Sequence, residues 1–237
     1  MDRGRKSGGD AGRDIGLTSQ GVRGVARASA EVRGEYARLA ETYDRRWASY
    51  IEASVRETVA RLDLRPGERL LDVGCGTGAL LAAVCSATAR PDAVGVDITP
   101  AMLVAAHGRR AGHADSCGAV AAADASRLPF VDATFDVVVS TSAFHFFESP
   151  HSALAEITRV LRTGGRLVIT DWCGDFVLCR ARDVALRLMN PAHRPAYRAR
   201  ECERLLREAG FVVRRLDTYR ISWLWGLMTV VARREVA

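Results

Sequence analysis

Three glycines stand at alternate positions in LLDVGCGTGALL, residues 70–81, between two apolar runs. The pattern is typical of a buried strand, a turn that needs backbone freedom, and the start of a helix. Gly74, Gly76 and Gly78 would let the backbone approach a ligand more closely than a Cβ atom permits. Gly74 and Gly76 with Ala79 also satisfy a loose form of the dinucleotide fingerprint GxGxxG/A, so the turn alone leaves a nicotinamide enzyme open.

Three aspartates accompany this turn and add charge to it. Asp97 ends the next predicted strand, about twenty residues past the turn, where a carboxylate can accept both hydroxyl hydrogens of an adenosine ribose. Asp124 ends the strand after that and can accept a hydrogen bond from an adenine amino group. Asp72 lies inside the first strand, where a buried carboxylate is expensive unless it bonds backbone amides or a ligand. A site this negative repels a pyrophosphate and suits a cationic ligand.

The elements that must position these groups alternate along the chain. Buried Val-rich strands followed by amphipathic helices predict an α/β fold, a parallel sheet covered by helices on both faces. The predicted strands are 69–74, 92–98, 119–123, 135–143 and 165–172, and the predicted helices are 78–87, 100–109 and 151–162. A helix at 199–210 and two strands at 211–223 and 227–234 close the chain. Before them, aromatic and aliphatic residues at steps of three and four predict one helix or two short helices at 31–62.

Composition limits the classes of protein that this chain can be. With 237 residues and 48% hydrophobic content, one domain with a small appendage is expected. Residues 1–30 hold few large apolar groups and no central hydrophobic block, so they predict a flexible tail and a cytoplasmic protein. That tail also carries half of the net charge of +6, which argues against a nucleic-acid partner. No apolar run approaches the roughly 18 residues of a transmembrane helix.

Cysteine and histidine patterns point to no metal site. The six cysteines form no CxxC pair and are scattered through a chain large enough to fold without staples, which predicts reduced thiols. No cluster of histidines and carboxylates stands at ligand spacing, so no metal cofactor is expected.

Four segments in ordered succession carry a family resemblance: LLDVGCGTG, VGVDITPAML, DASRLPFVDATFDVVVSTSAFHFF and ALAEITRVLRTGGRLVITDW. Together they resemble the class I S-adenosylmethionine-dependent methyltransferases, especially the branch with ubiquinone and menaquinone methyltransferases and many small-molecule enzymes. The resemblance covers roughly residues 36–172. It implies a three-layer Rossmann-like fold: a seven-stranded, mostly parallel sheet with an antiparallel last strand. It also implies a helical N-terminal cap at 31–62 and a catalytic domain at 63–237 with a substrate-binding insertion at about 173–200.

The resemblance also assigns residues to the cofactor, S-adenosylmethionine. It places the methionine part on Asp72 and on the backbone of Gly74, Cys75, Gly76 and Gly78, with no side-chain chemistry for Cys75. The other assignments are Asp97 for the ribose, Ile98 and Met102 for the adenine faces, Asp124 and Ala125 for the adenine edge, Ser140 for the amino group, and Tyr36 and Tyr43 of the YxxxAxxYD pattern over the sulfonium. Ile98 and Met102 could equally be ordinary core residues, and the two tyrosines could only pack the cap on the sheet.

The implied reaction is methyl transfer to oxygen, nitrogen or carbon of a small molecule, of aromatic, quinone-like or acid-bearing type. His145 in SAFHFF is the candidate base for a phenol or carbon acid, with a loop-orienting role as the alternative. Trp172, Phe176, His193 and Tyr197, interspersed with arginines, are candidate substrate-binding residues. A non-catalytic cofactor-binding subunit and an NAD-dependent oxidoreductase stay open as alternatives, and so does a homodimer.

Overall fold

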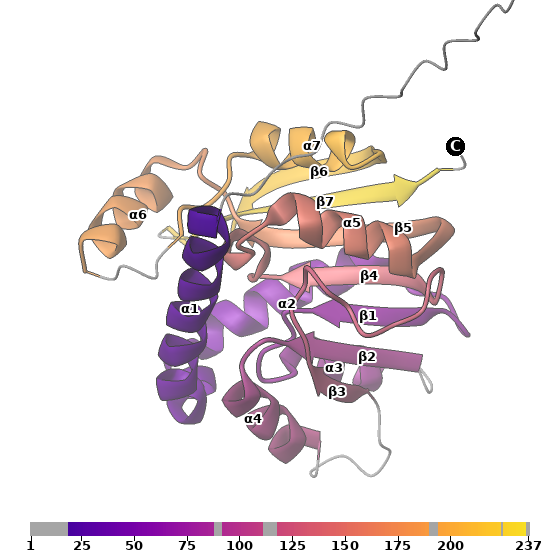
Figure 1. Cartoon of the computed structure of the whole chain (residues 1–237), viewed down its shortest axis with the longest axis horizontal. Coiled ribbons are helices and arrows are strands. Elements are labelled where there is room, and N and C mark those ends of the chain that lie inside the picture. Colours follow the sequence, from indigo (N-terminus) through magenta and orange to yellow (C-terminus); the bar gives the residue numbers. More distant parts are fainter. Residues whose placement is uncertain (1–18, 88–91, 111–117, 190–193, 224, 236–237) are drawn as a thin grey trace, which may run out of the picture.

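A seven-stranded sheet forms the centre of the molecule (Figure 1). The computed structural model describes residues 19–87, 92–110, 118–189, 194–223 and 225–235. The strands lie in the order β3-β2-β1-β4-β5-β7-β6. Their bounds are β1 Arg69–Val73, β2 Asp92–Asp97, β3 Ala119–Ala122, β4 Phe135–Thr141, β5 Leu161–Trp172, β6 Phe211–Arg220 and β7 Gly226–Arg234.

The sheet is parallel from β3 to β5, and β7 enters antiparallel between β5 and β6. The predicted seven-stranded, mostly parallel sheet with an antiparallel last strand is therefore confirmed. From β1, the chain first adds strands on one side (β2 and β3) and then on the other (β4 and β5). The connections after β1 and β4 therefore diverge at the carboxyl edge of the sheet. In open α/β sheets, ligands bind at this switch point.

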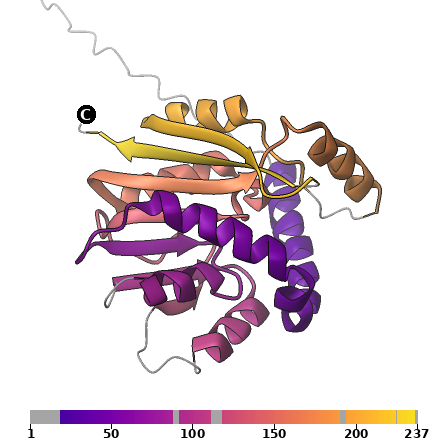
Figure 2. The same cartoon turned by 180° about the vertical axis from the view of Figure 1, so that it is seen from behind.

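Helices cover both faces, because successive strand residues point to opposite sides. Leu71 and Val138 face a core shared with α5 (Pro150–Val160) and α7 (Ala199–Glu208). Their neighbours Leu70 and Val137 face a second core, shared with α2 (Ala48–Leu62), α3 (Ala79–Ala87) and α4 (Pro100–Arg110). Figure 2 shows α2 and α3 on that second face. The three-layer architecture follows from these two cores.

The chain enters through α1 (Ser19–Arg46), which bends at Trp47 into α2. Figures 1 and 2 show α1 standing across the carboxyl ends of the strands, while α2 lies along one face of the sheet. We call α1 and α2 the cap helices. The predicted flexible tail overlaps α1, because the helix begins at Ser19; the Ala and Arg residues of that stretch are strong helix formers. The rest of the predicted tail, residues 1–18, lies outside the described residues.

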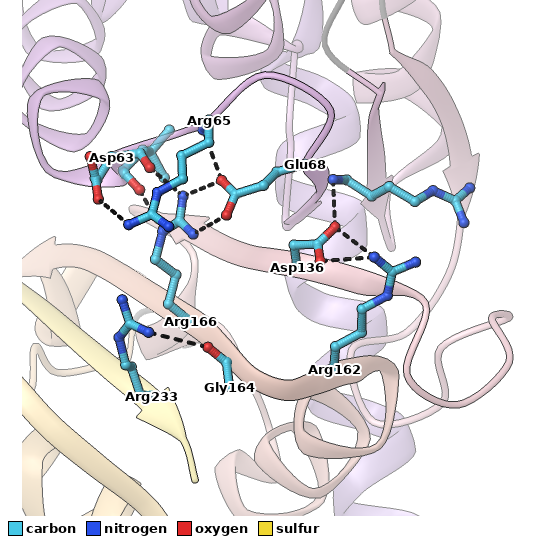
Figure 3. A network of polar contacts seen from close by, with 10 residues as sticks. Asp63, Arg65, Glu68, Asp136, Arg162, Gly164, Arg166 and Arg233 are labelled. Atoms are coloured by element: carbon cyan, nitrogen blue, oxygen red, sulfur yellow. Dashed lines mark hydrogen bonds and ion pairs between the residues drawn. The ribbon is translucent and has the colours of Figure 1, made fainter.

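A polar network fixes α2 at the opposite edge of the sheet, where the strands begin (Figure 3). Arg166 on β5 is nearly buried and donates to the carbonyl oxygens of Leu62 and Asp63 at 2.7 and 2.6 Å. Its guanidinium also holds both carboxylate oxygens of Glu68, at 2.8 and 2.7 Å. These hydrogen bonds lower the pKa of Glu68. The C-terminal end of α2 is thereby anchored to the central sheet.

Three predictions about composition can be compared with the fold. None of the described helices combines the length and the apolar character of a membrane span. The described residues also contain no group of three or more His, Cys, Asp or Glu side chains placed to hold a metal. Cys75, Cys173, Cys179 and Cys202 are buried and form no disulfide. Cys85 is disulfide-bonded, so the prediction of reduced thiols is wrong there; spacing along the chain does not show which cysteines the fold brings together.

Candidate active site

The glycine turn connects β1 to α3 and has the backbone conformation that the pattern predicts. Gly74, Gly76 and Gly78 have φ angles of +80°, +51° and +74°, in the region that side chains disfavour. At Gly74 an added Cβ would also lie 2.4 Å from the Cβ of Ala143, too close for any side chain. The amides of Gly74 and Cys75 donate to the carbonyl of Val96, which ties the turn to β2.

Asp97 at the end of β2 holds this turn from the side. One carboxylate oxygen accepts from the amide of Gly76 at 2.9 Å, and the other accepts from the amide of Thr99 at 2.8 Å. Burial raises the pKa of Asp97, and the two backbone hydrogen bonds oppose that shift. Each oxygen retains a lone pair, so the carboxylate can accept further hydrogen bonds from a diol.

Asp72 is the most unusual group in the site. The residue is 1% exposed, and its Oδ1 atom has no hydrogen-bond partner among the residues that the structure describes. Burial, with a smaller contribution from the nearby charge of Asp97, raises the pKa of Asp72 to about 8. A buried, unpaired carboxylate is strongly unfavourable. Asp72 therefore fits a ligand that brings a positive charge to this point.

One cleft joins most of the residues that the resemblance assigned to the cofactor. Its lining includes Tyr36, Tyr43, Asp72, Gly74, Cys75, Gly76, Asp97, Ile98, Met102, Asp124 and Ala125. Gly78 is outside this lining and instead lets α3 pass close to α4, where an added Cβ would lie 3.2 Å from that of Ala106. Ser140 is fully buried and outside the lining too; residues 141–143 of the same segment line the cleft.

Aromatic rings from the cap close one side of the cleft. The ring of Tyr36 lies 5.8 Å from that of Tyr43 and 5.4 Å from that of Phe146, which follows β4. Burial raises the pKa of Tyr43 to about 12 and that of Tyr36 well above its ordinary value, so both stay neutral. Tyr50 on α2 also lines the cleft, and its hydroxyl lies 2.6 Å from the Oγ of Ser142. No motif or periodic pattern in the sequence singles out Tyr50 or Ser142.

A polar latch joins α1 to the glycine turn and to α4. The hydroxyl of Thr77 donates to Asp44 at 2.7 Å, and Arg109 donates to the carbonyl of Thr77 at 3.0 Å. Arg109 also pairs directly with Asp44. Asp44 is the last residue of the YxxxAxxYD pattern, and the sequence assigned it no role. The latch holds the cap tyrosines over the cleft.

His145 lies in a short 3-10 helix after β4 and is buried against Asp171 on β5. Its Nδ1 lies 2.7 Å from Asp171 Oδ1, and its amide donates to Asp171 Oδ2 at 2.9 Å. With the Nδ1 hydrogen directed at the carboxylate, Nε2 is the basic nitrogen, and it has no partner. His145 does not line the cofactor cleft but a second cavity on the other side of Phe147 and Glu148, which line both.

The three candidate substrate-binding residues that the structure describes have different surroundings. Trp172 stacks on His145, with centroids 5.3 Å apart, and its Nε1 donates to the hydroxyl of Tyr50 at 2.6 Å. Tyr197 lines the second cavity. Phe176 packs on the core against Gly226, where an added Cβ would lie 2.0 Å from its ring. His193 lies outside the described residues.

Comparison with known proteins agrees with this geometry. A family model described as a methyltransferase domain matches residues 71–169, the segment from β1 to β5 that carries the glycine turn. The O-methyltransferase cnsE of Penicillium expansum is 37% identical over 163 residues, which are 67% of this chain and 57% of that protein. The chain belongs to the class I S-adenosylmethionine-dependent methyltransferases.

Further proteins are similar to this chain in sequence or in fold. A demethylmenaquinone methyltransferase of Symbiobacterium thermophilum is 38% identical over 144 residues, 58% of this chain and 57% of that protein. The chain thus spans less than three fifths of either curated relative. A methyltransferase of Haloferax volcanii, solved with the Trm112 activator, superposes with a TM-score of 0.73 at 21% identity, covering 85% of this chain and 98% of its own. At that identity the match supports the fold.

Proposed function

We propose that this protein transfers a methyl group from S-adenosylmethionine to oxygen, nitrogen or carbon of a small molecule. The observation that carries the proposal is the unpartnered Oδ1 of Asp72, beside a glycine turn and in one cleft with Asp97. An α-amino group supplies the missing positive charge, and a ribose supplies the diol that Asp97 can accept. A dinucleotide would bring a pyrophosphate to the same acids, which would repel it.

The remaining cofactor contacts follow from the lining of the cleft. The proposed roles are methionine binding for the backbone at Gly74–Gly78, adenine packing for Ile98 and Met102, and adenine-edge binding for Asp124 and Ala125. When bound, the cofactor supplies an electrophilic methyl group on a positively charged sulfur. The faces of Tyr36 and Tyr43 favour that charge, by about 0.5 to 2 kcal/mol once water is excluded.

The chain's own residues then have two tasks, alignment and exclusion of water. The cap helices cover the carboxyl edge of the sheet and are held there by the Asp44 latch. His145 is the proposed base for an acidic acceptor, because Asp171 fixes its tautomer and leaves Nε2 free to accept a proton. Trp172 links this histidine to Tyr50 and so to the cofactor cleft.

An aromatic, quinone-like or acid-bearing molecule is the proposed acceptor. The two curated relatives are named for O-methylation and for menaquinone methylation, and the aromatic side chains beside the cleft suit a flat acceptor. The test is to incubate the purified chain with deuterium-labelled S-adenosylmethionine and panels of phenols, quinols and aromatic acids, with mass spectrometry of the products. Labelled product supports the proposal; cofactor binding without product on any panel would favour a non-catalytic subunit.

A further inference from the structure

Four aromatic rings and one arginine form a cluster next to the cofactor cleft. The ring of Trp225 lies 4.7 Å from Trp172, 4.9 Å from Tyr50 and 5.8 Å from Trp47. These residues come from α2, the α1–α2 bend, the end of β5 and the position just before β7. We call the four rings the aromatic cluster. Tyr50 belongs both to this cluster and to the lining of the cofactor cleft, so the two sites share a wall.

Arg182 on α6 (Val177–Met189) places its guanidinium against this cluster. Its Cζ atom lies 3.6 Å from the ring centroid of Trp225, and 5.4 and 5.5 Å from those of Trp172 and Trp47. Contact with three indoles is favourable for a cation. It satisfies none of the five N–H donors of a guanidinium, however, because ring faces are poor hydrogen-bond acceptors.

Arg182 lacks the partner that other shielded arginines have. Arg61, Arg109, Arg159 and Arg166 each pair with a carboxylate. Within the described part of the chain, Arg182 makes contacts with aromatic rings and neither a hydrogen bond nor an ion pair. Partial burial lowers its pKa, the opposite of the shift at the paired Arg61 and Arg159.

The carboxylates near Arg182 and the cluster accept hydrogen bonds from other groups. Asp183, whose charge acts on Arg182, accepts from the amide of Ala196 at 3.0 Å. Asp171, at the end of β5 beside Trp172, accepts hydrogen bonds from the amide and Nδ1 of His145 and from the amide of Trp172. A planar fork of donors therefore lies against a cluster of mutually tilted aromatic rings, and no anion among the described residues pairs with it. That combination recognises a ring that carries a carboxylate, because the guanidinium binds the anion with two parallel hydrogen bonds while the indoles pack on the ring.

We propose that the aromatic cluster and Arg182 form the methyl-acceptor subsite, and that it selects a planar aromatic acid over neutral and cationic acceptors. The inference rests on the proposed function and narrows it, since the neutral quinol class is disfavoured. Arg182 is then the residue that determines charge specificity, while the rings accept any flat molecule. A purely structural role for Arg182 would affect stability and leave discrimination by charge unchanged.

The test compares 4-hydroxybenzoate with its neutral isostere 4-hydroxybenzamide, in the presence of saturating S-adenosylhomocysteine. Three of the four tryptophans belong to the cluster, so tryptophan fluorescence reports binding there. The variant W223F removes the remaining tryptophan, whose side chain is 76% exposed and contributes background. We expect the benzoate to bind about tenfold more tightly than the benzamide, a ratio typical of one charge-assisted bidentate pair.

Two arginine variants make the result specific. Arg182→Gln should reduce the ratio to near unity, whereas Arg56→Gln, an exposed arginine on α2 outside both cavities, should leave it unchanged. A ratio near unity in the parent protein, or an unchanged ratio in Arg182→Gln, would overturn the inference. Calorimetric titration with S-adenosylhomocysteine alone tests the proposed function separately: its binding without discrimination between the two probes would reject only the acceptor subsite.

Discussion

Replacement of Asp72 by asparagine tests the electrostatic basis of cofactor binding. In the free protein, burial raises the pKa of Asp72 from 3.8 to about 8, so the carboxyl group is mostly protonated at pH 7. A bound amino group would pair with the ionised form and lower this pKa again. Binding at pH 7 should then release about 0.9 proton per site, the protonated fraction at one unit below the pKa.

The same linkage fixes how affinity changes with pH. Between pH 6 and 7, below the titration of the ligand's own amino group, affinity for S-adenosylhomocysteine should rise about tenfold. Loss of one partner from a buried pair costs roughly 3 to 5 kcal/mol. In the parent protein, part of this gain is offset, because Asp72 must first lose its proton at pH 7, which costs about 1.4 kcal/mol. Asp72→Asn should therefore weaken binding at pH 7 by about 2 to 4 kcal/mol, and by less at pH 6.

Isothermal titration calorimetry in two buffers with different ionisation enthalpies measures the released proton directly. The parent protein should show a buffer-dependent enthalpy, and Asp72→Asn should not. The ligand-free parent should also lose stability as pH rises from about 4 to about 8 and level off above that, because over this range folded Asp72 keeps a proton that the unfolded chain has released. If the parent releases no proton on binding, or if both proteins release the same number, the assignment of the amino group to Asp72 is refuted.

Four further substitutions separate binding, closure, stability and proton transfer. Asp97→Ala should weaken S-adenosylhomocysteine binding by about 3 kcal/mol in calorimetry, since a carboxylate that bonds two hydroxyls is lost; unchanged affinity would show that the ribose lies elsewhere. Asp44→Ala should raise the dissociation rate of the same ligand in stopped flow by about tenfold by opening the latch; an unchanged rate would mean that α1 does not gate the cleft. Arg166→Met, at the far edge of the sheet, should lower the free energy of unfolding in urea by about 3 kcal/mol without changing ligand affinity; unaltered stability would contradict the anchoring of α2. His145→Gln should reduce turnover of a phenolic acceptor by about 10² or more at unchanged cofactor affinity; full activity would leave His145 a loop-orienting role.

The site residues that follow from the strand pattern, without the family resemblance, share one property: each lies near the end of a strand or in the turn after it. Asp72, Gly74, Asp97 and Asp124 follow from the apolar pattern of the strands, and the parallel sheet then brings their ends to one edge. Ser140 shows how far this reasoning reaches. It lies near the end of β4, but it is buried, and residues 141–143 after it line the cleft instead.

The contacts that could not be predicted depend on how the cap helices lie. The hydrogen bond from Thr77 to Asp44 joins positions 33 apart in sequence, and its formation requires the angle between α1 and the sheet. The same holds for Tyr50 and Arg182, whose neighbours come from elements distant along the chain. Local periodicity places a residue on a helix face, but the partner of that face is set by tertiary packing.

The central claim is that the cleft at the carboxyl edge of the sheet binds S-adenosylmethionine. Titration of the purified chain with S-adenosylmethionine and, separately, with NAD tests it most directly. We expect saturable binding of S-adenosylmethionine that S-adenosylhomocysteine displaces, and no binding of NAD. Binding of NAD alone would contradict it.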